Sequence, residues 1–378
     1  WVKHDRKTIG DRGEDVMTTM KDIRRSIAQM LTIGFKGTSP TPFVKRFLNK
    51  ESGGGVILFR RNLEGARQIL ELNNQLRELA VNEVPYLMVD QEGGPVMRLR
   101  QVATQVPSMG KVGEFPGVDE ARMAGEILGK EVQALGFNVN CAPVLDVDSN
   151  PDNPIIGERS FSRDPARVGL LGEAFIQGIQ GMGVLACGKH FPGHGDTTVD
   201  SHLDLPVLDH DLTRLKEVEL VPFRHVFEHA PPALVMTAHI LLPAFDGDHP
   251  ATLSRHIIPV LLREQLGFDG VVVTDDLEMK AVDDRYHMAE VVRLGLSADV
   301  DVFLICHEEE KQELALETLH KLVVDKQVSS ERIQRSLHRI RRSKLGLEGK
   351  SIPSVAKLSE FLCQPEARQW VERMDQGV

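Results

Sequence analysis

The chain has 378 residues, of which 55 are acidic and 45 are basic, so its formal net charge is −10. This length can bury the core of one large domain or of two ordinary ones. An acidic chain without a long basic block disfavours nucleic acid as the main partner. No apolar run approaches the roughly 20 residues of a membrane span and no signal peptide is recognised near Trp1, although a first residue other than Met leaves a removed export signal open.

Residues 1–23 are highly charged and show little periodicity, which predicts an N-terminal arm or a first surface helix. Beyond them, short apolar runs typical of buried strands alternate with segments of helical spacing. Strands are expected at residues 28–35, 54–59, 86–89, 138–144, 184–189, 234–238, 270–274 and 300–305. Helices are expected between them at residues 66–80, 119–135, 166–182, 212–228, 256–265, 288–297 and 309–324.

This alternation predicts the fold class. Apolar strands that are each followed by an amphipathic helix pair in parallel, and eight such units favour an α/β protein with a closed (β/α)₈ barrel of the TIM type. One catalytic domain would then span residues 24–347, and a doubly wound open sheet is the alternative. A last helix at residues 328–347 precedes residues 348–378, which are too short for a second core and are interpreted as a C-terminal tail or helix.

Ionisable side chains follow the ends of five predicted strands. In a parallel barrel the carboxyl ends of all strands meet at one rim, where functional side chains gather. The pattern therefore predicts a polar mouth at that rim. The residues concerned are Asp90, Asp146, Lys189 with His190, His239, and Asp275 with Asp276.

The segment at residues 188–206 concentrates ionisable residues and reads GKHFPGHGDTTVDSHLDLP. Pro192 would break a helix, and a sheet interior would bury these charges without partners. We therefore expect a surface loop at the mouth, with Gly193 and Gly195 allowing it to close over a bound substrate.

Metal-dependent hydrolysis is one chemistry that this loop suggests. The candidate ligands are His190, His194, Asp196, Asp200 and His202. However, ligands clustered in one flexible loop lack the fixed arrangement that a catalytic metal needs. We therefore expect neither a metal nor a cofactor, and a metal-dependent hydrolase is the less favoured alternative.

Glycoside hydrolysis is the second chemistry, and it needs a carboxylate near the anomeric carbon and a proton donor at the leaving oxygen. Asp275 or Asp276 can supply the carboxylate, and only one of them should face the mouth because successive strand residues point opposite ways. His202 is two residues from Asp200, close enough for the carboxylate to orient the imidazole as a donor. A hydrogen bond that merely stabilises the loop is the alternative for this pair.

Seven segments, taken in order, resemble glycoside hydrolase family 3, in particular its single-domain β-N-acetylglucosaminidases (β-hexosaminidases) of peptidoglycan recycling. They are QMLTIGFKGT (29–38), GGVILFRRN (54–62), MVDQEGG (88–94), CAPVLDV (141–147), KHFPGHGD (189–196) with DSH (200–202), VMTAH (235–239) and VTDDLEM (273–279). The resemblance covers residues 25–345, and the run KHFPGHG with DSH and TDDLEM is its most specific part. It implies a (β/α)₈ barrel without the second α/β domain of larger relatives.

The resemblance also implies roles for individual residues. Asp275 corresponds to the nucleophile and the Asp200–His202 dyad to the acid/base, which implies two displacements with retention. Contacts to sugar hydroxyls are implied for Asp90, Arg98, Arg159, Lys189 and His190. One departure is Pro95, which follows Gly94 where relatives usually have Arg, so the identity of the aglycone is put in doubt.

These implications lead us to expect a retaining exo-β-N-acetylglucosaminidase that removes GlcNAc from peptidoglycan-derived muropeptides. A phosphorylase or a β-glucosidase of the same family is the alternative. The phosphorylase is considered because an imidazole in place of a second carboxylate removes one negative charge from the site and would let phosphate approach. The expected partner is a small carbohydrate, with no nucleic acid and no membrane, and the expected state is a monomer or a weak homodimer. Four scattered cysteines without metal-binding spacing are typical of reduced thiols in the cytoplasm.

Overall fold

The computed structural model describes residues 20–201, 203–347, 349 and 354–377. Its main sheet has eight parallel strands in the order β10-β1-β2-β3-β6-β7-β8-β9. They are β1 (Leu31–Ile33), β2 (Gly55–Leu58), β3 (Tyr86–Val89), β6 (Val139–Asn140), β7 (Leu185–Phe191), β8 (Leu234–Thr237), β9 (Val271–Thr274) and β10 (Phe303–Ile305). A parallel bridge between Val273 and Val302 joins the two ends of this order and closes a barrel. The predicted (β/α)₈ fold is thereby confirmed, and the open sheet is excluded.

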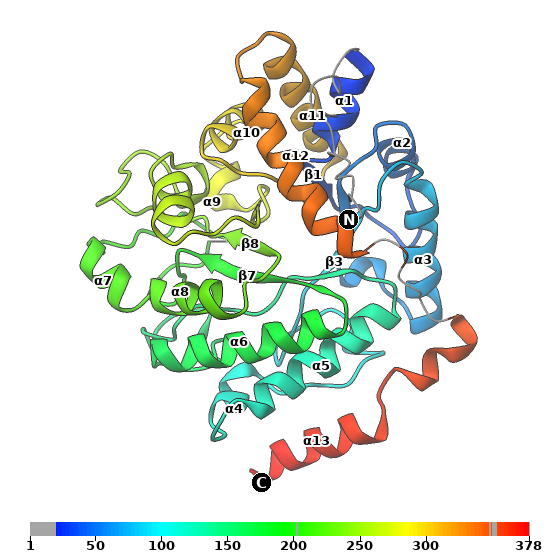
Figure 1. The fold of residues 1–378 in the computed structure, drawn as a ribbon, viewed down its shortest axis with the longest axis vertical. Coiled ribbons are helices and arrows are strands. Elements are labelled where there is room, and N and C mark those ends of the chain that lie inside the picture. Colours follow the sequence, from blue (N-terminus) through cyan, green and yellow to red (C-terminus); the bar gives the residue numbers. More distant parts are fainter. Residues whose placement is uncertain (1–19, 202, 348, 350–353, 378) are drawn as a thin grey trace, which may run out of the picture.

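Helices surround the barrel (Figure 1), so nearly every strand residue is buried. Burial on both faces is why these strands read as continuous apolar runs rather than as alternating patterns. The α-helices are α1 (Met20–Ala28), α2 (Pro42–Asn49), α3 (Ala66–Leu79), α4 (Met109–Gly113), α5 (Asp119–Ala134), α6 (Pro165–Gly181), α7 (Leu212–Glu217), α8 (Leu220–His229), α9 (Lys280–Asp283), α10 (Met288–Ser297), α11 (Glu309–Val324), α12 (Ser330–Lys344) and α13 (Pro365–Gln376).

Helices α5 and α6 pack unusually close together because of glycines. A Cβ added to Gly125 on α5 would lie 2.4 Å from the carbonyl oxygen of Phe175, and one added to Gly178 on α6 would lie 2.4 Å from that of Arg122. Any larger residue at either position would push the helices apart. This tight pair fixes the connections that lead into β6 and β7, and both strands contribute to the mouth.

Two predicted helices differ in detail from the structure. The single helix expected at residues 212–228 is two helices, α7 and α8, with a break at Val218. Pro222 explains the break, since a proline lacks the N–H that a helix interior requires but fits the first turn of a new helix. Residues Ile257–Gln265, expected to be an ordinary helix, are wound as a π-helix.

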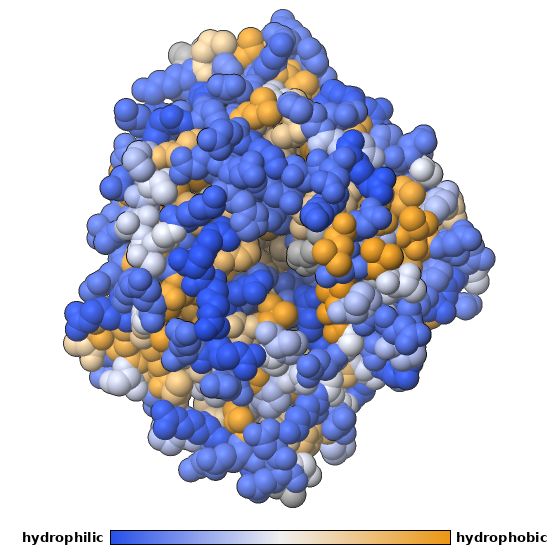
Figure 2. Space-filling model, turned by 180° about the vertical axis from the view of Figure 1, so that it is seen from behind, coloured by the Kyte–Doolittle hydropathy of each residue, from blue (hydrophilic) through white to orange (hydrophobic). Residues whose placement is uncertain are grey.

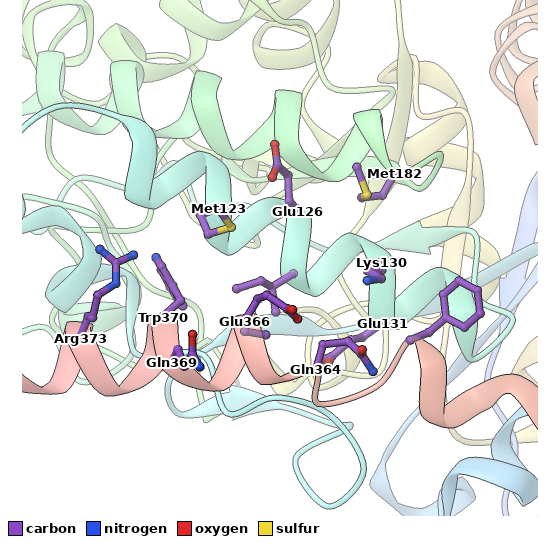
Figure 3. Close-up of a pocket in the computed structure, with 13 residues that line it drawn as sticks. Met123, Glu126, Lys130, Glu131, Met182, Gln364, Glu366, Gln369, Trp370 and Arg373 are labelled. Atoms are coloured by element: carbon purple, nitrogen blue, oxygen red, sulfur yellow. The ribbon is translucent and has the colours of Figure 1, made fainter.

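The C-terminal segment ends in α13, which lies along α5 (Figure 1). Trp370 on α13 is 3 % exposed, and its indole N–H donates to Glu120 of α5. A groove of about 530 Å³ remains between the two helices, with side chains of both facing across it (Figure 3). The groove lies on the outer helices rather than at the strand ends, so it is separate from the predicted mouth.

Figure 2 shows the face opposite to that of Figure 1, which is mostly hydrophilic, with an apolar patch beside a hollow near its centre. No helix among the described residues is long and apolar enough to cross a bilayer. Residues 1–19 of the predicted N-terminal arm lie outside the described residues, and so does His202. The proposed division of the chain at residues 23 and 347 stays a prediction.

Candidate active site

A pocket of about 130 Å³ lies at the carboxyl ends of the barrel strands, where the polar mouth was predicted. It is lined by Asp90, Glu92, Val96, Arg98, Ile155, Ile156, Arg159, Lys189, His190, His194, Ser201, Met236 and Asp275. All five residues expected to contact the sugar, together with Asp275, therefore line one cavity. The remaining lining residues come mainly from three segments: the loop after β6, the loop after β7, and the hairpin formed by β4 (Gln91–Gly93) and β5 (Val96–Met97).

One wall of the pocket is a row of alternating charges, which we call the ion row: Arg98, Asp90, Lys189, Glu92 and Arg159. Asp90 accepts from Arg98 at 3.2 Å and from Lys189 at 2.9 Å. The Lys189 Nζ also contacts Oε1 of Glu92 at 2.7 Å. Glu92 in turn receives two parallel bonds from Arg159, at 2.8 and 2.9 Å. Such bidentate contacts fix the plane of the guanidinium, so the row is rigid.

The ion row keeps Asp90, Glu92 and Lys189 charged although all three are buried. Burial alone would raise the pKa of Glu92, but Arg159 and Lys189 outweigh it and hold that pKa at about 2. Burial is likewise outweighed at Asp90, whose pKa lies below its ordinary value because of Lys189 and Arg98. Burial would lower the pKa of Lys189, but the two carboxylates raise it. The wall therefore presents fixed charges to a polar ligand across the neutral pH range.

Glu92 was not among the site residues named from the sequence. Its side chain is 2 % exposed, and it is the partner that both Lys189 and Arg159 share. The only signal in the sequence was its place in the segment MVDQEGG. Arg159 is thus paired with a buried carboxylate and is itself largely shielded from solvent.

Asp146 holds the end of β7 in place. Its fully buried carboxylate receives the backbone N–H groups of His190, at 3.2 Å, and of His194, at 2.7 Å. It also lies 2.7 Å from Nδ1 of His190. Burial would raise the pKa of Asp146, but the two histidines lower it. An ionised carboxylate only accepts, so the Nδ1 atom of His190 carries a proton.

The expectation that residues 188–206 form a surface loop is wrong for its first part. Lys189 and His190 belong to the strand β7, and both are buried. The argument from buried charge failed because each charge has a partner, supplied by Asp90, Glu92 and Asp146. The loop proper begins at Gly193, whose φ of +130° is open to glycine but not to larger residues.

His194 and Gly195 anchor the start of this loop. The two ring nitrogens of His194 lie 2.8 Å from the hydroxyl of Thr197 and 3.1 Å from that of Ser201. A Cβ at Gly195 would lie 1.7 Å from the carbonyl oxygen of Val147, so this position has no room for a side chain. The loop is thereby packed closely against the segment that follows β6.

We expect this anchor to weaken in acid. Burial, followed by the charge of His190, lowers the pKa of His194 to about 4. An unfolded histidine titrates near pH ~6.5, so the stabilisation is complete above that pH and is lost as the pH falls from about 6.5 to 4. The loss should reach about 3 kcal/mol. Urea titrations at several pH values measure the free energy of unfolding of the wild type and of His194→Gln. The difference between the two should shrink as the pH falls from about 6.5 to 4. For the exposed control His229→Gln, the difference from the wild type in unfolding free energy should not change comparably with pH. If the difference for His194→Gln is also independent of pH, the predicted pH dependence of the anchor is refuted.

The two adjacent aspartates after β9 point in different directions, as the alternation along a strand predicts. Asp275 lines the pocket. Asp276 turns away, with its carboxylate 3.1 Å from Nε2 of His307 and 3.2 Å from the backbone nitrogen of Cys306. Of the two candidates for the nucleophilic carboxylate, only Asp275 faces the cavity.

The acid/base dyad is described only in part, since His202 lies outside the described residues. Its neighbour Ser201 lines the same pocket as Asp275, while Asp200 is half-buried and is not among the lining residues. The backbone N–H of Ala281, after β9, donates to the carbonyl of Ser201 at 3.3 Å. The segment that carries the dyad is thus fastened beside the strand that carries Asp275, and the dyad's role stays a prediction.

Two other rim residues are structural. His239 is fully buried, with its ring nitrogens 2.8 Å from the hydroxyl of Thr252 and 3.1 Å from the carbonyl of Asp276. Pro95 sits in the turn between β4 and β5 and is not among the residues that line the pocket. Arg98 is nevertheless held in the ion row, so the departure at Pro95 leaves this wall complete.

Comparison with known families identifies the chain. A model of the glycosyl hydrolase family 3 N-terminal domain matches residues 22–343. The chain belongs to glycoside hydrolase family 3. Among solved structures, this family 3 chain is similar to a β-N-acetylglucosaminidase of the same family from Paenibacillus sp., with a TM-score of 0.89 and 38 % identity over 93 % of this chain and 68 % of that one.

Curated relatives of this family 3 chain include β-hexosaminidases. The protein from Pseudomonas aeruginosa is 38 % identical over 296 residues, which cover 78 % of this chain and 87 % of that protein. The β-hexosaminidase A of Pseudoalteromonas piscicida is 39 % identical over 287 residues, covering 71 % of this chain. The match spans about half of that relative's own length, 48 %.

Proposed function

We propose that this family 3 chain is a retaining exo-β-N-acetylglucosaminidase that removes terminal GlcNAc from muropeptides derived from peptidoglycan, in the cytoplasm. The observation that carries the reaction is that Asp275 and Ser201, the residue between Asp200 and His202, line one small pocket with the ion row. The printed names of the relatives, β-hexosaminidase and β-N-acetylglucosaminidase, support the choice of sugar. A pocket of about 130 Å³ favours one terminal sugar over an internal stretch of polymer.

The proposed mechanism has two displacements. Asp275 attacks the anomeric carbon while His202, oriented by Asp200, protonates the leaving oxygen. Water activated by the same imidazole then hydrolyses the glycosyl-enzyme, with net retention. The ion row and His190 would orient the sugar hydroxyls, since charged groups make the stronger hydrogen bonds.

An assay panel tests the proposed substrate. Nitrophenyl β-GlcNAc, nitrophenyl β-glucoside and a GlcNAc-terminated muropeptide are compared with and without phosphate, and the sugar product is analysed. We expect turnover of both GlcNAc substrates at rates independent of phosphate, with free GlcNAc as product. A sugar phosphate would identify a phosphorylase instead, and preference for the glucoside would identify a β-glucosidase. Full activity after exhaustive chelation would eliminate a metal-dependent hydrolase.

The proposed acid role of His202 predicts a dependence on the leaving group. In His202→Ala, kcat/KM for the muropeptide or an alkyl glycoside should fall by about 10²–10⁴-fold, because only a poor leaving group needs the proton. For a dinitrophenyl glycoside, kcat/KM should fall by less than about tenfold. Steady-state kinetics on both substrates measures the two losses, and equal losses would refute the acid role.

A further inference from the structure

A second cluster of ionisable residues lies at the base of the loop, outside the pocket. Asp196 comes from the loop itself, His210 from the segment before α7, and Glu219 from the residue that caps α8 (Figure 1 shows α7 and α8). One ligand atom of each, an imidazole nitrogen or a carboxylate oxygen, lies within 4.8 Å of the others. The three residues lie on different segments of the chain. In the sequence, Asp196 was grouped only with ionisable residues of its own loop, so this cluster was not predicted.

The geometry of the cluster differs from that of an ordinary ion pair. Nε2 of His210 lies 2.9 Å from Oδ2 of Asp196 and 4.0 Å from Oε1 of Glu219. The first contact is short, yet it is too poorly aligned for a hydrogen bond, and this nitrogen has no hydrogen-bond partner among the described residues. The Nε2 atom of His210 therefore makes no hydrogen bond with Asp196 despite their proximity and stays available to a ligand.

Glu219 supplies the second, independent observation. The residue is 2 % exposed, and its Oε2 is buried without a hydrogen-bond partner in the part of the chain that the structure describes. Its other oxygen, Oε1, accepts from Arg214 at 3.1 and 3.2 Å. An unpartnered buried carboxylate oxygen costs free energy, so it indicates a missing ligand. Arg214 satisfies only one side of this carboxylate.

We propose that Asp196, His210 and Glu219 bind one divalent transition-metal ion, with Zn²⁺ as the best fit. One imidazole and two carboxylates are a ligand set that zinc accepts, and bonds of about 2.0–2.1 Å place tetrahedral ligands about 3.3 Å apart. The 2.9 Å contact between His210 and Asp196 is close to that spacing, and one ligand atom of each of the three residues lies within 4.8 Å of the others, so small side-chain shifts would complete the site. Two carboxylates against the single charge of Arg214 leave the site negative, which favours a cation.

Such an ion would fasten the base of the loop to α8. A Cβ on Gly193, the first residue of the loop, would lie 2.8 Å from the side chain of Glu219, so the two elements already touch. Bound Zn²⁺ would link Asp196, two residues beyond the His194 anchor, to the same glutamate. We therefore expect metal binding to slow backbone exchange over residues 193–201.

The test measures Zn²⁺ binding to the full chain by competition with a chromogenic chelator, with folding of each variant checked by circular dichroism. The wild type should bind one equivalent with a Kd on the order of micromolar or tighter. His210→Gln should weaken binding by at least about 100-fold, and His210→Cys should retain it because a thiolate is also a zinc ligand. Arg214→Gln should tighten binding by about tenfold, because it removes a neighbouring positive charge.

Two controls separate this site from others on the chain. Glu173, His225 and His229 form a more exposed cluster between α6 and α8, so the double variant His225→Gln/His229→Gln should bind Zn²⁺ as the wild type does. The same should hold for Asp275→Asn, which alters the catalytic pocket. Absence of binding in the wild type, binding that survives His210→Gln, or binding lost in either control would overturn the proposal.

Hydrogen exchange over residues 193–201 should slow with Zn²⁺ in the wild type but not in His210→Gln. These readouts do not depend on glycosidase activity.

Discussion

Asp275→Asn is expected to lower kcat/KM for every aryl β-GlcNAc by about 10⁴-fold or more, because the amide cannot form the glycosyl-enzyme. The neighbouring Asp276→Asn is the matched control. Its carboxylate faces His307 and Cys306 rather than the pocket, so a loss of less than about tenfold is expected. Steady-state kinetics on nitrophenyl β-GlcNAc measures both.

A second readout distinguishes a lost nucleophile from a damaged fold. Asp275→Ala leaves space where the carboxylate was, so azide should restore turnover of an activated aryl glycoside and yield the glycosyl azide of inverted configuration. Unchanged activity in Asp275→Asn, or a larger loss in Asp276→Asn, would assign the nucleophile to another residue.

Lys189→Met is expected to cost about 3–5 kcal/mol of folding free energy, because it leaves Asp90 and Glu92 buried without the cation between them. Lys111→Met is the matched control. Lys111 is also paired with an aspartate, Asp375, but the two side chains are 35 % and 64 % exposed, so a change within about 1 kcal/mol is expected. Urea unfolding at neutral pH measures both variants. A loss at Lys189 no larger than that at Lys111 would show that the ion row adds little to the stability of the barrel.

The eight strands and the position of the mouth could be predicted from the sequence because they depend on local patterns. A buried parallel strand is an apolar run of about four to eight residues, and the ionisable residue that follows it marks the rim. Asp90 and Asp275 were placed in this way, and both line the pocket. Alternation along the strand likewise predicted that Asp275 and Asp276 would face different ways.

Contacts between distant segments could not be predicted in this way. Lys189 and Asp90 are 99 residues apart, and no spacing rule connects them. Glu92 and Asp146 were quoted within motifs, but their burial and their partners appear only when the strands are assembled. The same limit explains why residues 189–194 were expected at the surface. Their charges are compensated by groups after β3, on β4 and after β6. Asp200 and His202 retain roles taken from resemblance, because His202 lies outside the described residues.

The ion row has a further consequence for how a sugar would be bound. Its five side chains restrain one another through contacts within the protein, so their rotamer entropy is lost during folding rather than at the moment of binding. Hydroxyl groups entering the pocket would meet oriented donors and acceptors, and the reorganisation that opposes tight binding of the transition state would be small. A substitution that loosens Glu92 should therefore weaken the affinity for transition-state mimics even if the new side chain never touches the sugar.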